Sequence, residues 1–332
     1  MSRKHVFAGL VAVAAMAVGL GAVGAGAEGP PPCEPSCATL VPQLDGNGPF
    51  GVTQGPRGSM YFGIGHDIVR IDQQGDTTSY PVSSQDEQDV GWLTSGPDGA
   101  VWFCERDTGK IGRLGANGVM REYQLPSPDA VPQGIVFAPD GNVYVTEQGS
   151  NAIARVNPTT GAAVDIPVPT PNSTTQSGAL GADGAIWFVE RAAAKIGRMT
   201  LDGTFTEYQL AAGSFPNRIV AGPDGALWFS ELRANKVGRL TTSGHLTEYP
   251  ADGPVGITVG KDGQFYLASF TDAAMLRMNL SGEITGTWPL PGAGGPLQVS
   301  PGFGLDVWIT DTFGNQVYRV TPYDTGRWHS GA

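Results

Sequence analysis

The sequence predicts an all-β protein, a seven-bladed β-propeller whose blades are four-stranded antiparallel sheets. Short runs rich in Val, Ile, Trp, Phe and Tyr alternate with Gly, Asp and Asn turns, a pattern typical of strands and hairpins. An aromatic residue recurs seven times at steps of 38 to 43 residues, and an arginine follows each copy. A period of about 42 residues with four strand-like runs in each unit is typical of propeller blades.

The repeated residues mark the same two strands in every blade. The aromatic positions are Tyr61, Trp102, Tyr144, Trp187, Trp228, Tyr266 and Trp308. The arginines are Arg70, Arg113, Arg155, Arg198, Arg239, Arg277 and Arg319.

The fifth repeat illustrates the four strands of a blade. We expect an innermost strand at 218–222, a second at 226–231, a third at 236–240 and an outer strand at 246–251. Asp-Gly at 224–225 and Ser-Gly at 243–244 are residue pairs that tight hairpins require.

The last repeat has no clear copy of the outer strand. The segment LVPQL, Leu40–Leu44, resembles that strand. We therefore expect this N-terminal segment to complete the last blade and close the ring, which removes exposed sheet edges. The propeller is predicted to span 40–322, followed by a C-terminal tail at 323–332.

The N-terminus resembles a secretory signal peptide at 1–27. A basic start is followed by an apolar run from Val6 to Ala25 and by the small residues Ala25-Gly26-Ala27, which predict cleavage before Glu28. An uncleaved anchor is the alternative, although the run is built of Ala and Gly rather than Leu. We expect a secreted protein that has no stable membrane span after signal cleavage.

The three cysteines divide into two groups. A Pro/Gly-rich segment at 28–39 contains Cys33 and Cys37, which could close a small disulfide in an oxidising compartment. Cys104 lies in an apolar run and is expected to be a buried small hydrophobe.

The chain is strongly acidic. Its formal charge is −11, and loss of Arg3 and Lys4 with the signal peptide makes it −13. Because such a protein repels phosphate backbones and has no basic run, we expect no nucleic-acid partner. We expect a monomer that binds a small molecule or a peptide.

In a propeller, the innermost strand begins and the second strand ends on one face around the central channel, where ligands commonly bind. The residues that end the second strands are Ile64, Glu105, Glu147, Glu190, Glu231, Ser269 and Asp311. A ring of carboxylates could hold Mg²⁺ or Ca²⁺. Alternatively, each carboxylate bonds a neighbouring strand or arginine, as a feature repeated from blade to blade suggests.

A second set of residues lies where the chain leads into each innermost strand. These lead-in positions, seven residues before each hairpin aspartate or its equivalent, are Phe50, Gly91, Gln133, Gln176, Asn217, Val255 and Leu297. They do not repeat, so a specific function is expected there. None is a general acid or base near neutral pH. His66 is predicted on this face without a visible partner, and His245 in an outer turn.

Three blocks, at 95–114, 181–199 and 222–240, resemble blades of the virginiamycin B lyase family, and the resemblance covers about residues 40 to 322. It implies a seven-bladed propeller and an Mg²⁺-dependent elimination that linearises B-type streptogramins. The family histidines are implied at Val255 and Leu297, and a glutamate at Gly295. The family tyrosine falls at Phe50, and a late glutamate falls near Asp311 and Thr312, of which only Asp311 could help to hold a metal.

The leading hypothesis is a secreted platform that binds a ligand or partner through its central face, with the lyase machinery lost or reassigned. Its candidate ligand-binding residues are Phe50, Gln133, Gln176, Asn217, Val255 and Leu297. The alternative is a metal-assisted enzyme, either a carbon–oxygen lyase of the streptogramin lyase type or a lactonase-type hydrolase. Its cation would be held by Glu105, Glu147, Glu190, Glu231 and Asp311. A third hypothesis is a cell-envelope module tethered by GPPPCEPSC.

Overall fold

The computed structural model describes residues 38–44, 48–82 and 90–322. They belong to one compact unit, Pro32–Ala332. The predicted signal peptide, the two N-terminal cysteines and the C-terminal tail lie outside these residues. Within the described ranges, no helix has the length and apolar character needed to cross a membrane.

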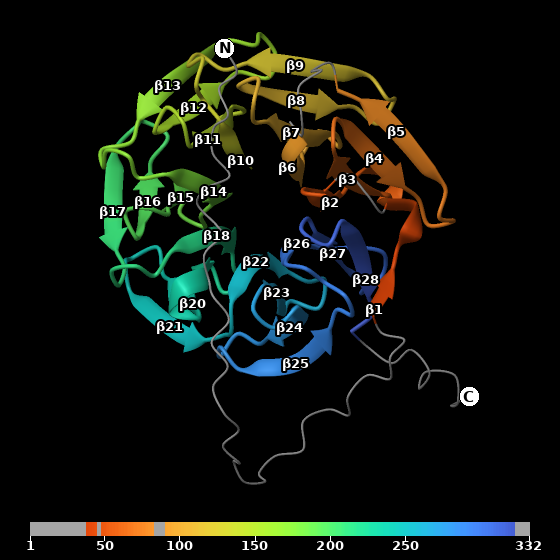
Figure 1. Cartoon of the computed structure of the whole chain (residues 1–332). Helices are drawn as coiled ribbons and strands as arrows, with labels where there is room; N and C mark the ends of the chain where they lie inside the picture. The colour runs from red at the N-terminus through yellow and green to blue at the C-terminus, as the bar shows by residue number, and fades with distance from the viewer. Residues whose placement is uncertain (1–37, 45–47, 83–89, 323–332) are drawn as a thin grey trace, which may run out of the picture. The chain divides into compact units, whose positions relative to one another are not determined.

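The described residues form seven four-stranded antiparallel sheets, which confirms the predicted propeller (Figure 1). Blade 1 contains β2 Val52–Gln54, β3 Met60–Ile64, β4 Asp67–Ile71 and β5 Thr77–Pro81. Blade 2 contains β6 Val90–Ser95, β7 Val101–Glu105, β8 Lys110–Leu114 and β9 Met120–Gln124. Blade 3 contains β10 Pro132–Phe137, β11 Val143–Glu147, β12 Ala152–Val156 and β13 Ala163–Pro167.

Blades 4 to 7 continue the same order from the innermost strand outward. Blade 4 contains β14 Thr175–Leu180, β15 Ile186–Glu190, β16 Lys195–Met199 and β17 Phe205–Gln209. Blade 5 contains β18 Pro216–Ala221, β19 Leu227–Glu231, β20 Lys236–Leu240 and β21 Leu246–Pro250. Blade 6 contains β22 Pro254–Val259, β23 Phe265–Ser269, β24 Ala274–Met278 and β25 Ile284–Pro289. Blade 7 contains β26 Pro296–Pro301, β27 Val307–Asp311, β28 Gln316–Val320 and β1 Ala38–Leu40.

The innermost strands of neighbouring blades contact one another around the ring, from β2 through β26 and back to β2. Short 3₁₀ turns occur at η1 Pro42–Leu44, η2 Pro56–Gly58 and η3 Leu232–Ala234.

An N-terminal strand closes the last blade, as predicted, but it lies earlier in the chain than Leu40–Leu44. Strand β1 pairs antiparallel with β28, so that Leu40 lies opposite Tyr318. Pairing stops at Pro42, which has no N–H and begins η1. Val41 and Leu44 are buried in a cluster that contains residues of blades 7 and 1. This segment therefore packs between the two blades instead of extending the sheet.

The repeated aromatic and arginine residues meet at one aspartate in each of blades 2, 4 and 5. In blade 5, Trp228 Nε1 donates to Asp224 Oδ1 at 3.0 Å and Arg239 Nε donates to Oδ2 at 2.7 Å. The Arg239 guanidinium lies 5.9 Å from the indole centroid, while the ring of Tyr249 stacks on the indole at 5.5 Å. We call this arrangement the aspartate clasp. Its counterparts are Asp98, Trp102 and Arg113, and Asp183, Trp187 and Arg198.

Trp228 of the clasp and the residue that follows it also pack closely against a neighbouring blade and a neighbouring strand. Trp228 packs against Phe265 of blade 6, with ring centroids 4.3 Å apart. The next residue, Phe229, lies opposite Gly238 on the neighbouring strand. A Cβ at Gly238 would lie 2.2 Å from the Phe229 ring, so this position requires glycine. The repeated Trp-Phe and Gly-Arg pairs thus reflect close packing.

We predict that Asp224→Ala lowers the free energy of unfolding by about 1–3 kcal/mol, because it leaves a buried indole N–H without an acceptor. Urea unfolding of the purified variant measures this loss. Asp76→Ala, in the exposed connection between β4 and β5 of blade 1, is the control and should change the free energy by less than about 0.5 kcal/mol. Equal midpoints for Asp224→Ala and the wild type would contradict the account.

Candidate functional site

The innermost strand of each blade begins where the second strand ends, as in the pairing of Pro216 with Glu231 in blade 5. The same pairing joins Pro132 to Glu147 in blade 3 and Thr175 to Glu190 in blade 4. We call the face formed by these ends, with the loops that join them, the central face. Both sets of residues singled out from the sequence lie on it or directly beneath it.

A chain of hydrogen bonds links Trp92 of blade 2 to the lead-in positions of blades 3 and 4. Trp92 Nε1 donates to Gln133 Oε1 at 3.0 Å. Gln133 Nε2 and Gln176 Nε2 donate to the same acceptor, Gln148 Oε1, at 2.9 and 3.1 Å. Three amide side chains from two blades are thereby held in one orientation.

Arg191 continues this chain into blade 5. Its Nη2 donates to the side-chain oxygens of Gln176 and Asn217. Asn217 Nδ2 in turn donates to the carbonyl of Val255 in blade 6 at 3.2 Å. The predicted residues Gln133, Gln176 and Asn217 are thus brought together, but they are buried. They position Trp92, Gln148 and Arg191, and their assignment to ligand binding stays a prediction.

Two arginines beside this chain of hydrogen bonds, Arg191 and Arg233, were not predicted from the sequence. Arg191 and Arg233 both lie over the ring of Phe215, with guanidinium carbons 5.0 and 4.2 Å from the centroid. Phe215 has a φ of 58°, a left-handed conformation that is uncommon for a bulky residue. The residues that follow the second-strand carboxylates differ between blades, and that variation is the signal that could have identified Arg191.

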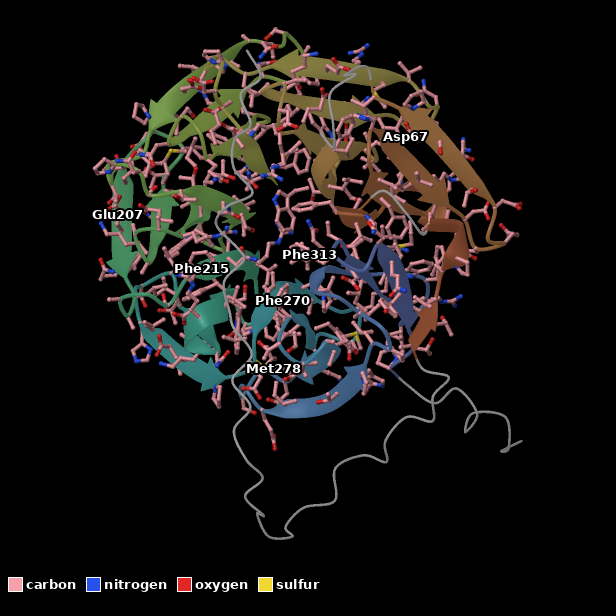
Figure 2. All side chains as sticks on the ribbon, viewed as in Figure 1. Asp67, Glu207, Phe215, Phe270, Met278 and Phe313 are labelled. Carbon is pink, nitrogen blue, oxygen red and sulfur yellow. The ribbon has the colours of Figure 1, made fainter. Side chains whose placement is uncertain are left out.

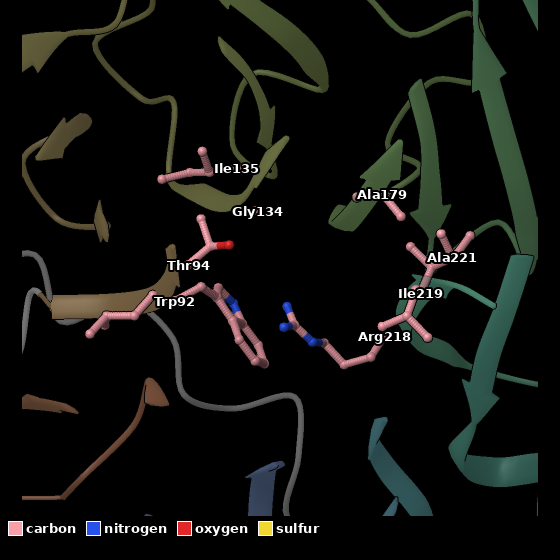
Figure 3. A pocket seen from close by; sticks show the side chains of 11 residues that line it. Trp92, Thr94, Gly134, Ile135, Ala179, Arg218, Ile219 and Ala221 are labelled. Atoms are coloured by element: carbon pink, nitrogen blue, oxygen red, sulfur yellow. The ribbon is translucent and has the colours of Figure 1, made fainter. Parts of the chain in front are cut away.

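Trp92 and Arg218 face each other across the central channel, with the guanidinium carbon 4.0 Å from the ring centroid (Figure 3). Both lie one residue beyond a lead-in position, and blades 3 and 6 carry Gly134 and Gly256 at the equivalent positions. The two side chains border a cavity of about 240 Å³. Burial lowers the pKa of Arg218 to about 10, so the side chain remains charged at neutral pH.

The part of the central face that blades 6 and 7 contribute is apolar, and we call it the apolar sector. The lead-in residues Val255 and Leu297 are buried there. Phe270 and Phe313 meet edge to face with centroids 5.9 Å apart, and Figure 2 shows both on the inner side of the ring. Phe50 contacts Trp92 edge-on at 5.1 Å and so joins the apolar sector to the amide chain.

The residues at the implied family positions do not fit a Mg²⁺ site. A Cβ at Gly295 would lie 2.5 Å from Phe270, so a glutamate there would collide with the ring. Both oxygens of Asp311 already accept backbone N–H groups, from Gly294 at 2.7 Å and Gly314 at 2.9 Å. Among the described residues, no three His, Cys, Asp or Glu side chains gather as a metal site.

The carboxylates that end the second strands are all fully buried. Several bond residues of the turn that follows: Glu105 accepts from Thr108 at 3.1 Å, and Glu147 accepts from Ser150. The repeated arginines contact the hairpin aspartates at the other end of the strand, as in the pair Arg239–Asp224. In blade 5, Glu231 lies opposite Lys236 of the neighbouring strand, whereas the repeated Arg239 bonds Asp224.

Burial of these glutamates raises their pKa and so favours their protonated form. Burial raises the pKa of Glu147, Glu190 and Glu231 to about 7 in each case. Neighbouring carboxylates add to the effect, Asp165 at Glu147 and Glu248 at Glu231. These groups are therefore partly protonated near neutral pH, which weakens them as cation ligands.

We predict that Glu190→Gln is more stable than the wild type at pH 8, by on the order of 1–3 kcal/mol. An unfolded glutamate titrates near about pH 4.3, so the folded wild type holds an extra proton between that pH and about 7. Its stability therefore falls as pH rises through this window, and the variant should lack that part of the decline.

Urea unfolding at pH 4 to 8 measures the difference, with the exposed Glu283→Gln as control. If Glu190 instead holds a cation, the variant should lose stability at pH 8 and lose any stabilisation by Mg²⁺.

The comparisons with known proteins agree with this architecture. The model of the Virginiamycin B lyase family matches residues 42–212 and 158–329. A virginiamycin B lyase from Nocardia farcinica is 34% identical over 113 residues, which span 34% of this chain and 39% of that protein.

Two solved structures are similar over nearly their whole length. One is a catalytically inactive histidine-to-alanine variant of virginiamycin B lyase from Staphylococcus aureus with quinupristin. It has 30% identity and a TM-score of 0.78, covering 86% of this chain and 98% of that one. The other is a streptogramin B lyase, with 28% identity and a TM-score of 0.79, covering 86% and 97%. The central face of the seven blades carries arginines and amides beside an apolar part. Because the family model matches most of these blades, the chain belongs to the virginiamycin B lyase family.

Proposed function

We propose that this protein is a binding platform that takes up a small molecule or a peptide at its central face. The carrying observation is the chain of hydrogen bonds from Trp92 through Gln148 to Arg191, which holds polar side chains from four blades in fixed orientations. Fixed polar groups beside an apolar wall are typical of sites that recognise one ligand.

We also propose that the family's lyase chemistry is lost or reassigned here. The family positions implied for histidine carry Val255 and Leu297, and neither side chain can accept a proton. The apolar contacts of Gly295 and the backbone bonds of Asp311 support the same proposal. The loss of a general base alone reduces rates by about 10²–10⁴-fold.

The burial and the raised pKa of the carboxylates favour the binding platform over a metal-assisted enzyme. A lyase or a lactonase-type hydrolase would need Glu105, Glu147, Glu190, Glu231 or Asp311 to reach a shared cation. These side chains are buried at the ends of separate blades, and burial raises the pKa of three of them to about 7.

A thermal-unfolding screen of metals, sugars and peptides tests the binding proposal. We predict that a ligand which stabilises the wild type stabilises Gln176→Ala much less, because this variant releases Gln148 and Arg191. Gln124→Ala, on the outer strand β9, is the control. Unchanged ligand shifts in Gln133→Ala, Gln176→Ala and Asn217→Ala would place the ligand elsewhere.

Incubation with quinupristin and Mg²⁺ tests the proposed loss of lyase activity. We predict no linear product above the background without enzyme, as measured by mass spectrometry. Turnover that a chelator abolishes would contradict the proposal and support the metal-assisted enzyme.

We further propose that the protein is secreted after removal of residues 1–27. The basic start and the small residues at Ala25-Gly26-Ala27 support export. Intact-mass analysis of protein from the culture medium of a bacterial host should give an N-terminus at Glu28. Recovery of the full-length chain in the membrane fraction would instead indicate an uncleaved anchor.

A further inference from the structure

We propose that the ligand of the central face is a small organic acid, whose carboxylate contacts Arg191 and whose apolar part packs against the aromatic residues of the same face. This inference rests on the proposed binding function of that face. It adds the charge and the chemical class of the ligand.

The first support is an imbalance of charge. Arg191, Arg218 and Arg233 form no ion pair with any residue in the described ranges, whereas arginines of the outer blade such as Arg239 bond a hairpin aspartate. Three guanidinium groups therefore lie on one face of a protein whose formal charge is −11. A local excess of positive charge on a surface attracts ligands of the opposite sign.

The second support is the hydrogen-bond inventory of Arg191. A guanidinium carries five N–H donors and accepts nothing. The Nη2 group is held by the oxygens of Gln176 and Asn217, which fixes the plane of the side chain. The Nε donor is buried and has no acceptor. A buried donor without an acceptor is costly, and a carboxylate oxygen is the acceptor that an arginine binds best.

The third support is the electrostatic state of Arg191. Burial lowers the pKa of Arg191 to about 10, and the nearby charges of Arg106 and Arg233 lower it further in the same direction. The side chain is therefore charged at neutral pH, in a setting that disfavours its charge. An anion at this position would offset both the burial and the repulsion.

The aromatic residues favour an organic acid over a bare inorganic anion. The ring of Phe215 contacts both arginines, because the guanidinium carbons of Arg191 and Arg233 lie 5.0 and 4.2 Å from its centroid. In the apolar sector of the same face, Phe313 is 44% exposed. Exposed rings of this kind gain free energy when they cover an apolar group.

Calorimetric titration with 4-phenylbutyrate and its uncharged analogue 4-phenylbutyramide tests the inference. We predict that the acid binds saturably and at least about tenfold more tightly than the amide, because only the acid carries a charge for Arg191. Its affinity should fall as NaCl rises, since salt screens charges that are partly exposed.

Two variants locate the contact. Arg191→Gln should weaken binding of the acid at least about tenfold, while Arg121→Gln, an exposed arginine on the outer strand β9, should leave it unchanged. Because Arg191→Gln could disturb the fold, the wild type provides a second readout. The Nε–H resonance of Arg191 in ¹H–¹⁵N spectra should shift with the acid and not with the amide.

Four results would overturn the inference. Equal affinity for acid and amide would indicate a neutral ligand and would leave the proposed binding function standing. Binding of the acid that neither depends on Arg191 nor shifts its resonance would place the anion elsewhere. Tighter binding of inorganic phosphate than of 4-phenylbutyrate would replace the organic acid with a phosphate ligand. Absence of binding by all three probes would refute the anion site, while the ligand screen with Gln176→Ala would still decide the binding function.

Discussion

The aspartate clasp is the interaction on which the rest of the structure depends. One carboxylate at the first hairpin holds a buried indole N–H and an arginine, and the indole then packs against the next blade. These hydrogen bonds outweigh the effect of burial and hold the pKa of Asp224 below its ordinary value. Because the clasp works at the hairpin end of the strands, it leaves the opposite end, and hence the central face, free to vary.

That freedom allows a family scaffold to carry different residues on its central face. Seven similar blades place seven loops around one channel, and only the loop residues decide the chemistry. In this chain, blades 2 to 5 supply amides and arginines, whereas blades 6, 7 and 1 supply Val255, Leu297 and phenylalanines. The face therefore combines charge with an apolar wall, which suits recognition of an amphipathic ligand better than it suits acid–base chemistry.

The fold could be predicted because its signals repeat: Asp224, Trp228, Gly238 and Arg239 have counterparts in other blades, each required by packing. The limits of the closing strand β1 could not be predicted from the sequence, because whether Pro42 ends the strand pairing depends on the residues packed around it. The lead-in amides were found because they do not repeat. Arg191 and the partnership of Trp92 with Arg218 were missed, since side chains that meet across the channel lie far apart in sequence.

The central claim is that the face binds an anion through arginine rather than a cation through carboxylates. A crystal structure of the protein grown with both 4-phenylbutyrate and Mg²⁺ tests this claim most directly. The account predicts a carboxylate within hydrogen-bonding distance of the Arg191 guanidinium, the phenyl group against the aromatic residues of the central face, and no Mg²⁺ on any side chain of that face. A Mg²⁺ ion bound by Glu105, Glu147, Glu190, Glu231 or Asp311 would contradict it.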